Sequence, residues 1–139
     1  MRLTWSQVSG LPLYCFEKER PIGRINAAFF NPETGALIAL LIGYAKVVVP
    51  PDIEKWTRDG IWIGNEDELC DLADILRIRE FGFKRCYLLG KKVLAEKGNA
   101  VGRVKDFTID TQSGTILNIE SAKGFFFLTW NRRIFPYTD

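Results

Sequence analysis

Residues 21–42 read PIGRINAAFFNPETGALIALLI, and residues 100–121 repeat much of this pattern as AVGRVKDFTIDTQSGTILNIES. Gly23 and Gly102 lie 79 positions apart, and most of the apolar positions that follow them match at the same spacing. A pattern that returns at a fixed spacing indicates two copies of one structural unit. The predicted architecture of the 139-residue chain therefore depends on what each copy folds into.

Each copy has the turn chemistry of a β-hairpin. The turn reads NPETG in the first copy and DTQSG in the second. The side chains of Asn31 and Asp110 can accept a hydrogen bond from the backbone two residues further on, which initiates a turn. Gly35 and Gly114 then supply the positive φ that a hairpin with a G1-type bulge requires. The sequence therefore predicts one hairpin in each copy.

The two hairpins are expected at about residues 24–42 and 103–121. Gly23 and Gly102 stand directly before them, where glycine indicates a sharp bend or a close approach of two backbones. In the second copy the apolar residues change parity along the first strand. This change predicts a β-bulge near Lys105.

Short apolar segments flank both hairpins and predict further strands. They are PLYCF, KVVVP and GIWIG around the first hairpin, and KVLAE and RRIFP around the second. About five or six short antiparallel strands per copy are typical of a small barrel. The predicted fold class is therefore all-β, with two tandem small antiparallel β-barrels over residues 1–79 and 80–139.

A short helix is expected to link the two barrels. Leu69 and Leu72 recur at helical spacing in the segment NEDELCDLADILRI. Asn65 and Glu68 have the spacing of a capping box. We therefore predict a short amphipathic helix or helical turn at about residues 66–77.

The two repeated segments, with VVVPPDI after the first and RIFPYTD after the second, resemble the PRC-barrel family. In that family a G-x-[VI] strand leads to a D/N-x-x-[ST]-G turn, an apolar strand and a proline-containing stretch. The resemblance covers nearly the whole chain, twice, and so implies a tandem PRC-barrel protein. The family includes the cytoplasmic domain of the photosynthetic reaction-centre H subunit and the C-terminal domain of a ribosome maturation factor.

The resemblance implies a function in docking, because the family shares a barrel that binds other macromolecules and shares no catalytic residues. We therefore expect a non-enzymatic protein-interaction or assembly module without a cofactor. The alternative is a ribosome- or RNA-associated factor. The second copy departs from the pattern, because it has no counterpart of the strand at residues 60–64. Its last strand is expected to be missing, and the open edge to be paired in a homodimer or against the first barrel.

Little in the sequence points to catalysis or to a metal site. The chain has no histidine, which is the usual general base near neutral pH. The P-loop, dinucleotide-binding and G-x-S-x-G motifs do not occur. An acidic run of Glu66, Asp67, Asp71 and Asp74 lacks the glycine-spaced loop of a calcium site. It also surrounds Cys70, and the chain has no histidine that could activate this thiol.

Charge and hydropathy favour a soluble, cytoplasmic protein. The 19 basic and 17 acidic residues give a formal charge of +2, which is too balanced to indicate nucleic-acid binding. The most apolar run, ALIALLIGYAKVVVP, is too short to span a bilayer, and the first residues do not read as a secretory signal. Cys15, Cys70 and Cys86 form no metal-binding motif and are expected to be buried free thiols.

The segment KGFFFLTWNRRIFP carries the candidate partner-binding residues Phe125, Phe126, Trp130, Arg132 and Arg133. The second copy has about five more residues here than the first, and they are aromatic. One reading is that they close the barrel or pack on the first domain. The other is an aromatic anchor for a protein partner, since interfaces favour tryptophan, phenylalanine and arginine.

The same segment allows the RNA alternative. Its aromatic side chains could stack on bases, with Arg132, Arg133, Lys91, Lys92 and Lys123 on phosphates. The near-neutral charge of the chain makes a protein partner the better reading.

Overall fold

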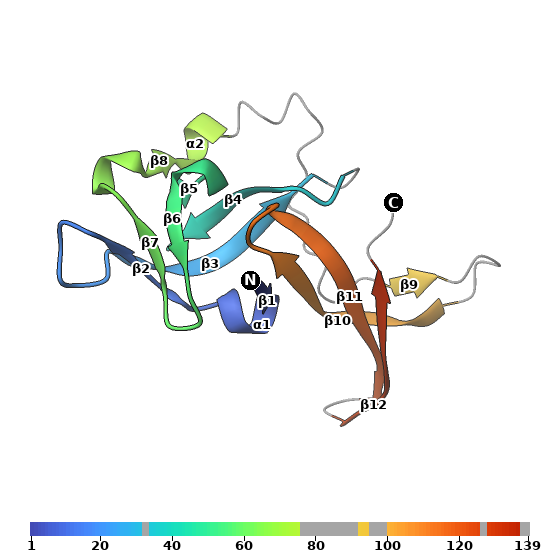
Figure 1. Cartoon of the computed structure of the whole chain (residues 1–139). Helices are drawn as coiled ribbons and strands as arrows, with labels where there is room; N and C mark the ends of the chain where they lie inside the picture. Colours follow the sequence, from blue (N-terminus) through green and yellow to red (C-terminus); the bar gives the residue numbers. More distant parts are fainter. Residues whose placement is uncertain (32–33, 76–91, 95–99, 126–127, 137–139) are drawn as a thin grey trace.

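The structure is a computed structural model that describes residues 1–31, 34–75, 92–94, 100–125 and 128–136. Within these residues the chain is mostly β-strand, with few and short helical segments (Figure 1). The prediction of a predominantly β fold is confirmed. None of the described helices has the length and apolar character needed to cross a membrane.

The first sheet has the strand order β6-β7-β2-β3-β4-β5-β8 and is strongly curled (Figure 1). Its strands are β2 Pro12–Cys15, β3 Gly23–Phe30, β4 Leu37–Ile42, β5 Lys46–Val48, β6 Ile53–Trp56, β7 Ile61–Ile63 and β8 Cys70–Asp71. The expectation of antiparallel strands alone was wrong, because β2 and β7 pair in parallel, with Leu13 opposite Ile61. The parallel pairing is possible because β3 to β6 lie between them in the chain and provide the long crossover that it needs.

The second sheet has the order β1-β10-β11-β12, and β9 also pairs with β10. Its strands are β1 Arg2–Thr4, β9 Lys92–Leu94, β10 Ala100–Asp110, β11 Thr115–Phe125 and β12 Leu128–Pro136. The helical segments are α1 Trp5–Val8 and α2 Leu72–Ile75, with 3-10 turns η1 Pro50–Asp52 and η2 Glu66–Glu68. The N-terminal strand thus joins the sheet that is otherwise built from the second copy.

The hairpins β3–β4 and β10–β11 have the same register. Every residue pair of the first hairpin, from Ile25 opposite Ile42 to Phe30 opposite Leu37, becomes a pair of the second when 79 is added to both numbers. The irregularities recur too, because each hairpin shifts register at two corresponding places. One of them skips Lys105, so the predicted bulge is confirmed.

The two turns also share their geometry. Gly35 and Gly114 have φ of 74° and 69°, the left-handed region that the turn chemistry requires. Each donates its N–H at 2.8 Å to the carbonyl of the residue that begins the turn, Asn31 or Asp110. The Asp110 carboxylate accepts the N–H of Gln112 at 3.0 Å, and this bond holds the pKa of Asp110 below its usual value.

Gly23 is a point of close approach, as its position in the sequence indicates, and the atom it meets belongs to a side chain. It begins β3, and a Cβ atom placed on it would lie 2.4 Å from Cγ2 of Ile42. A larger side chain therefore fits there only if the Ile42 side chain shifts. Gly102 occupies the corresponding place in β10, opposite Val93 of β9.

The turns bond to each other. The Leu37 N–H donates to the Gly114 carbonyl at 2.5 Å, and the Ile116 N–H donates to the Gly35 carbonyl at 2.9 Å. Between these two bonds, Ala36 and Thr115 form an antiparallel bridge. The residue number of Leu37 plus 79 gives Ile116, and that of Gly35 plus 79 gives Gly114, so the two bonds are equivalent in the two copies. Such reciprocity is the pattern of a two-fold interface.

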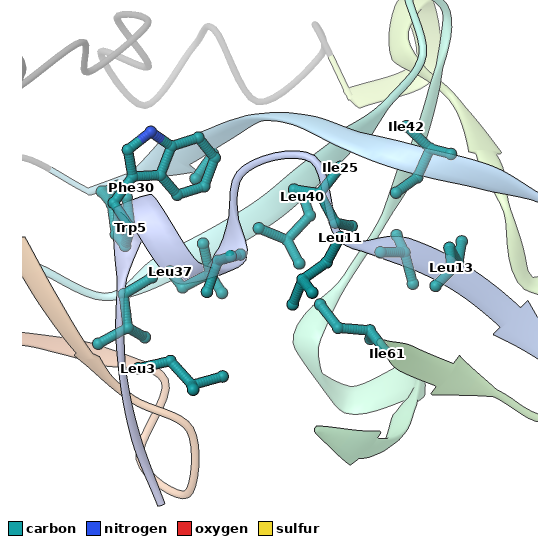
Figure 2. Packing of buried hydrophobic residues seen from close by; sticks show 14 of the residues in the cluster. Leu3, Trp5, Leu11, Leu13, Ile25, Phe30, Leu37, Leu40, Ile42 and Ile61 are labelled. Carbon is teal, nitrogen blue, oxygen red and sulfur yellow. The ribbon is translucent and has the colours of Figure 1, made fainter. Parts of the chain in front are cut away.

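One apolar core lies under both sheets (Figure 2). Leu3 of β1 is fully buried and pairs with Ile109 of β10. The ring of Phe107 stacks on Trp5 with centroids 5.7 Å apart, and it meets Phe30 edge-on at 5.3 Å. The core therefore includes side chains of β1, α1 and both hairpins.

Two separate barrels are not established by this arrangement, because β1 and the core cross between the two copies. The expected domain boundary between residues 79 and 80 lies outside the described residues and stays a prediction.

A buried carboxylate fastens α1 to β10. Asp106, next to the bulge, accepts the Ser6 N–H at 3.1 Å and the Ser6 hydroxyl at 2.7 Å. Thr4 and Gln7 form a capping box on the same turn of helix. The bulge thus places a charged acceptor where the free N–H groups of a helix start need one.

The predicted helix or helical turn at about residues 66–77 is confirmed only in part, because η2 and α2 are helical and strand β8 lies between them. The segment forms η2, then β8, then α2, and residues from 76 to 91 lie outside the described residues. Asn65 does cap its first turn, by accepting the Asp67 N–H at 2.8 Å. Strand β8 interrupts the helical segment because Cys70 pairs with Val47 on the edge of β5. An unpaired sheet edge outweighs a weak helix propensity.

Replacing Leu3 with alanine is expected to lower the free energy of unfolding by about 2–5 kcal/mol, because it leaves a cavity in the core. Urea unfolding should show one transition by circular dichroism and by tryptophan fluorescence, since both sheets share that core. The control Arg2→Ala, at an exposed position of the same strand, should change stability by less than about 0.5 kcal/mol. The shared core would be contradicted by two separate unfolding transitions, if Leu3→Ala lowered the urea midpoint of only one of them.

Gly114→Ala is expected to lower stability by about 1–2 kcal/mol, because a Cβ atom disfavours the left-handed backbone. A Cβ at this position meets no atom within 4 Å, so steric clash adds nothing. Gly114→Asn should lose less, since asparagine tolerates this conformation better. Thermal unfolding measures both variants, and equal losses would show that the φ of the turn is not the cause.

Candidate partner-binding surface

The structure places the sequence-predicted candidates on one extended hairpin. Phe125 ends β11 opposite Leu128, while Trp130 lies in β12 opposite Lys123. Arg132 and Arg133 follow in β12. Phe126 lies outside the described residues. The backbone thus brings these candidates together, and their role in binding stays a prediction.

The length of this hairpin can be measured against the first copy. Leu40 pairs with Val48, and Ile119, 79 positions after Leu40, pairs with Phe135. Val48 and Phe135 are 87 positions apart, so the second copy has eight extra residues here. The expectation of about five was too small. Part of the extra length continues the two-stranded ladder, with Lys123 opposite Trp130 as one of its pairs.

A second aromatic group lies on the outer surface of the first sheet. Tyr14 of β2 and Trp62 of β7 are register partners, and their rings stack with centroids 4.8 Å apart at 20°. The ammonium of Lys55 on β6 lies 5.3 Å from the centroid of the Trp62 ring. The neighbours Leu13 and Ile61 are fully buried, so Tyr14 and Trp62 point away from the core.

We call Tyr14, Trp62 and Lys55, together with Phe16, the aromatic patch. Phe16 follows β2 and is 59% exposed, which is high for such a large apolar side chain. Exposed aromatic side chains beside a cation are typical of protein interfaces. The alternation in PLYCF and GIWIG shows which residues face outward. Only the parallel pairing of β2 with β7 brings the two rings together, so the sequence did not reveal the patch.

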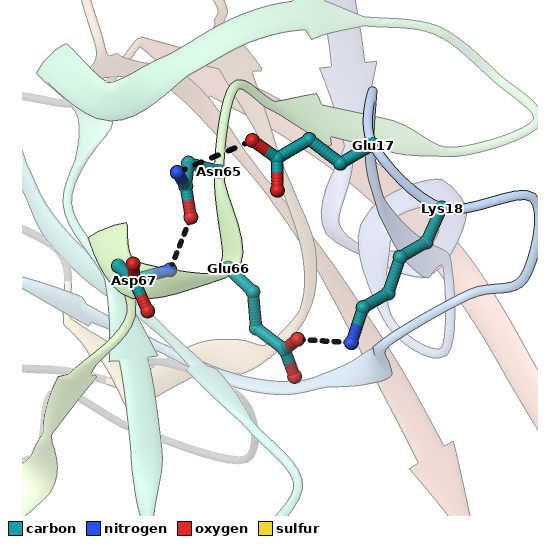
Figure 3. Close-up of polar contacts among 5 residues, drawn as sticks. All are labelled: Glu17, Lys18, Asn65, Glu66 and Asp67. Atoms are coloured by element: carbon teal, nitrogen blue, oxygen red, sulfur yellow. Dashed lines mark hydrogen bonds and ion pairs between the residues drawn. The ribbon is translucent and has the colours of Figure 1, made fainter.

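Polar contacts fix the loop that follows Phe16 (Figure 3). Lys18 forms an ion pair with Glu66, which raises the pKa of Lys18. The Asn65 amide donates to the Glu17 carboxylate at 3.3 Å. These contacts join the β2–β3 loop to η2 at the border of the aromatic patch.

The acidic run considered as a metal site is partly paired with lysines. Glu66 contacts Lys18, and Asp71 contacts Lys46 at 2.5 Å. Over the described ranges, no three histidine, cysteine, aspartate or glutamate side chains gather as a metal site would require. Cys15 is buried, as expected. Cys70 is exposed at the sheet edge, so the expectation of a buried thiol was wrong there.

Comparison with protein families finds a PRC-barrel domain at residues 82–138. This range includes the second hairpin and the hairpin that carries the candidate aromatic and arginine residues. A search of curated proteins returns no match to the chain.

A double-mutant cycle on Tyr14→Ala and Trp62→Ala tests whether the aromatic stack exists in solution. The expected coupling is about 0.5–1.5 kcal/mol beyond the loss of buried area, because offset stacking adds to hydrophobic contact. Chemical denaturation of the four proteins of the cycle measures it. A parallel cycle with Tyr14→Ala and Tyr44→Ala is the control, since Tyr44 is 90% exposed in the β4–β5 turn. A coupling near zero in both cycles would contradict the stack.

Proposed function

We propose that this protein is a non-enzymatic protein-interaction or assembly module built on tandem PRC-barrel units, residues 1–79 and 80–139. The observation that carries the proposal is the shared register of the two hairpins. The second hairpin lies in a PRC-barrel domain, and the first repeats its pairs and bulges at one spacing. The tandem arrangement accounts for this repetition, and the docking role follows from the family resemblance.

Two surfaces support docking. The first is the extended β11–β12 hairpin, with Trp130, Arg132 and Arg133 in its outer strand. The second is the aromatic patch, where Tyr14 and Trp62 stack on each other and remain partly exposed. Large aromatic side chains beside cations contribute most of the energy in many interfaces. We propose the β11–β12 hairpin as the main docking site, because eight extra residues there have no counterpart in the first copy.

The experiment is affinity capture of the tagged full chain from its native cell, with mass spectrometry of the bound proteins. Trp130→Ala and Arg132→Ala should each reduce recovery of the same partner by about tenfold or more, as interface hot spots do. Tyr44→Ala is the matched control, because this exposed aromatic residue lies away from the hairpin, in the β4–β5 turn. Circular dichroism must show that the variants remain folded.

A partner that binds all three variants equally would exclude the hairpin as the docking site. If Trp62→Ala then loses the partner, the aromatic patch is the site instead. No specific partner in any capture would contradict the docking function itself. We place the module in the cytoplasm, which imaging of the tagged protein tests directly.

The second candidate function is association with RNA or the ribosome. The observation that favours it is that Lys123 of β11 lies opposite Trp130 of β12. A positively charged residue next to an aromatic one is the combination that binds a phosphate and a stacked nucleobase. Gel-shift assays with ribosomal RNA and random RNA separate the candidates. RNA binding predicts an affinity that falls steeply with salt, whereas protein docking predicts no such affinity.

A further inference from the structure

Four of the five described strands of the second sheet correspond to strands of the first, and β1 has no counterpart among the described strands. Strand β10 corresponds to β3 and β11 to β4 through the common register. Strand β12 corresponds to β5, because Ser121 pairs with Arg133 as Ile42 pairs with Lys46. Strand β9 corresponds to β2, since each lies beside the glycine that opens the hairpin. The first sheet is therefore a template for what the second sheet can bind.

The sheets differ in several strands, and one of the differences lies at the edge beyond β5 and β12. In the first, β8 continues the sheet beyond β5. In the second, the corresponding edge belongs to β12, and no strand of the described residues pairs with it on that side. An open edge presents backbone donors and acceptors to which another extended segment can add.

Strand β8 shows what kind of segment this edge accepts. It runs antiparallel to β5, with Asp71 opposite Lys46 and Cys70 opposite Val47. The Asp71 carboxylate lies 2.5 Å from the Lys46 ammonium. The Leu72 N–H, one residue further on, donates to the Ala45 carbonyl at 2.7 Å. The segment therefore contributes three things to the contact: two residues in extended conformation, one acidic side chain, and the backbone N–H of the next residue.

The template transfers to β12 at Arg133; beyond this residue the ladder shifts register between Ser121 and Lys123, so Arg132 is matched by its position in the chain. Lys46 corresponds to Arg133, and Ala45 therefore corresponds to Arg132. The cation is kept, since arginine stands where the first copy has lysine. Arginine also binds a carboxylate through two parallel hydrogen bonds, which lysine does not.

We propose that the outer edge of β12 binds an extended acidic segment of a partner protein as an added antiparallel strand. An aspartate or glutamate lies opposite Arg133, and the next N–H of the segment donates to the Arg132 carbonyl. The inference rests on the proposed docking function, for which it names the chemistry of the partner. It gives Arg133 the charge that faces the acid, and it adds a role for the Arg132 carbonyl to the side-chain contact of Arg132 that the capture experiment tests.

The charge pair sets the register more than it supplies affinity. Exposed ion pairs contribute little affinity, and main-chain hydrogen bonds with side-chain contacts supply the rest. A one-residue slip would move the acid to the other face of the sheet, away from Arg133. Partners without an acid at this place are therefore expected to bind in several registers or not at all.

The test joins the template strand to the full chain. A flexible Gly/Ser linker after Asp139 is followed by NEDELSDLADI, which is residues 65–75 with serine for Cys70. We expect a higher midpoint of thermal unfolding and at least tenfold slower hydrogen exchange in the outer-edge N–H groups of β12. The exchange of β5 should not change, because β8 already covers that edge. The control extension carries Asp71→Lys, and it should protect β12 much less.

Host variants complete the design. Arg133→Glu should lose the protection by the acidic extension and regain it with the lysine extension, which a merely structural role for Arg133 does not predict. The inference is overturned if β12 gains no protection from either extension, or if both extensions protect it equally. Self-association of the unextended chain that Arg133→Glu abolishes would identify a second copy as the occupant, and would overturn the assignment to a partner protein.

Failure of this inference and failure of the docking function give different results. If a captured partner still binds the Arg133→Glu variant, the docking function is supported and the proposal of an added strand is excluded. If the acidic extension protects β12 but no partner is found in any capture, the proposed binding of an acidic strand at this edge is supported and the docking function is excluded.

Discussion

The reciprocal hydrogen bonds between the two turns determine how the rest of the molecule is arranged. Leu37 and Ile116 can each donate to the glycine carbonyl of the other turn only if both turns have the same backbone shape. Gly35 and Gly114 provide that shape through positive φ. The bonds place the hairpins side by side, so that Phe107 of one reaches Phe30 of the other. The shared core forms on this contact.

The shared core has a consequence for function. Because β1, α1 and both hairpins bury apolar faces together, and Ala27, Phe29, Ala39, Leu41 and Val47 are buried in a second cluster, the described surfaces that remain for a partner include the outer face of β2 and β7 and the edge of β12. The first of these carries the aromatic patch. The first copy covers the edge that corresponds to that of β12 with β8. The duplication therefore compares, within one chain, an edge that a strand covers with an edge on which the described residues place no strand.

The parts of the fold that could be predicted are those that depend on residues close together in the sequence. The turns followed from Asn31, Asp110 and their glycines, and the bulge at Lys105 followed from the parity of neighbouring residues. The helix or helical turn expected at about residues 66–77 is interrupted because Cys70 and Asp71 pair with β5, some 25 residues earlier. The stack of Tyr14 on Trp62 was missed because it depends on a parallel pair across a long crossover.

The sequence by itself determined the two hairpins, their register and the common conformation of their turns. Local φ preferences and the alternation of apolar residues encode these features. The tertiary structure alone decided which strand covers which edge, where β1 lies, and that the copies share one core. Edge pairing joins residues up to about a hundred positions apart, and the backbone groups that pair are nearly the same in every residue. No local pattern can therefore distinguish one partner strand from another before the chain has folded.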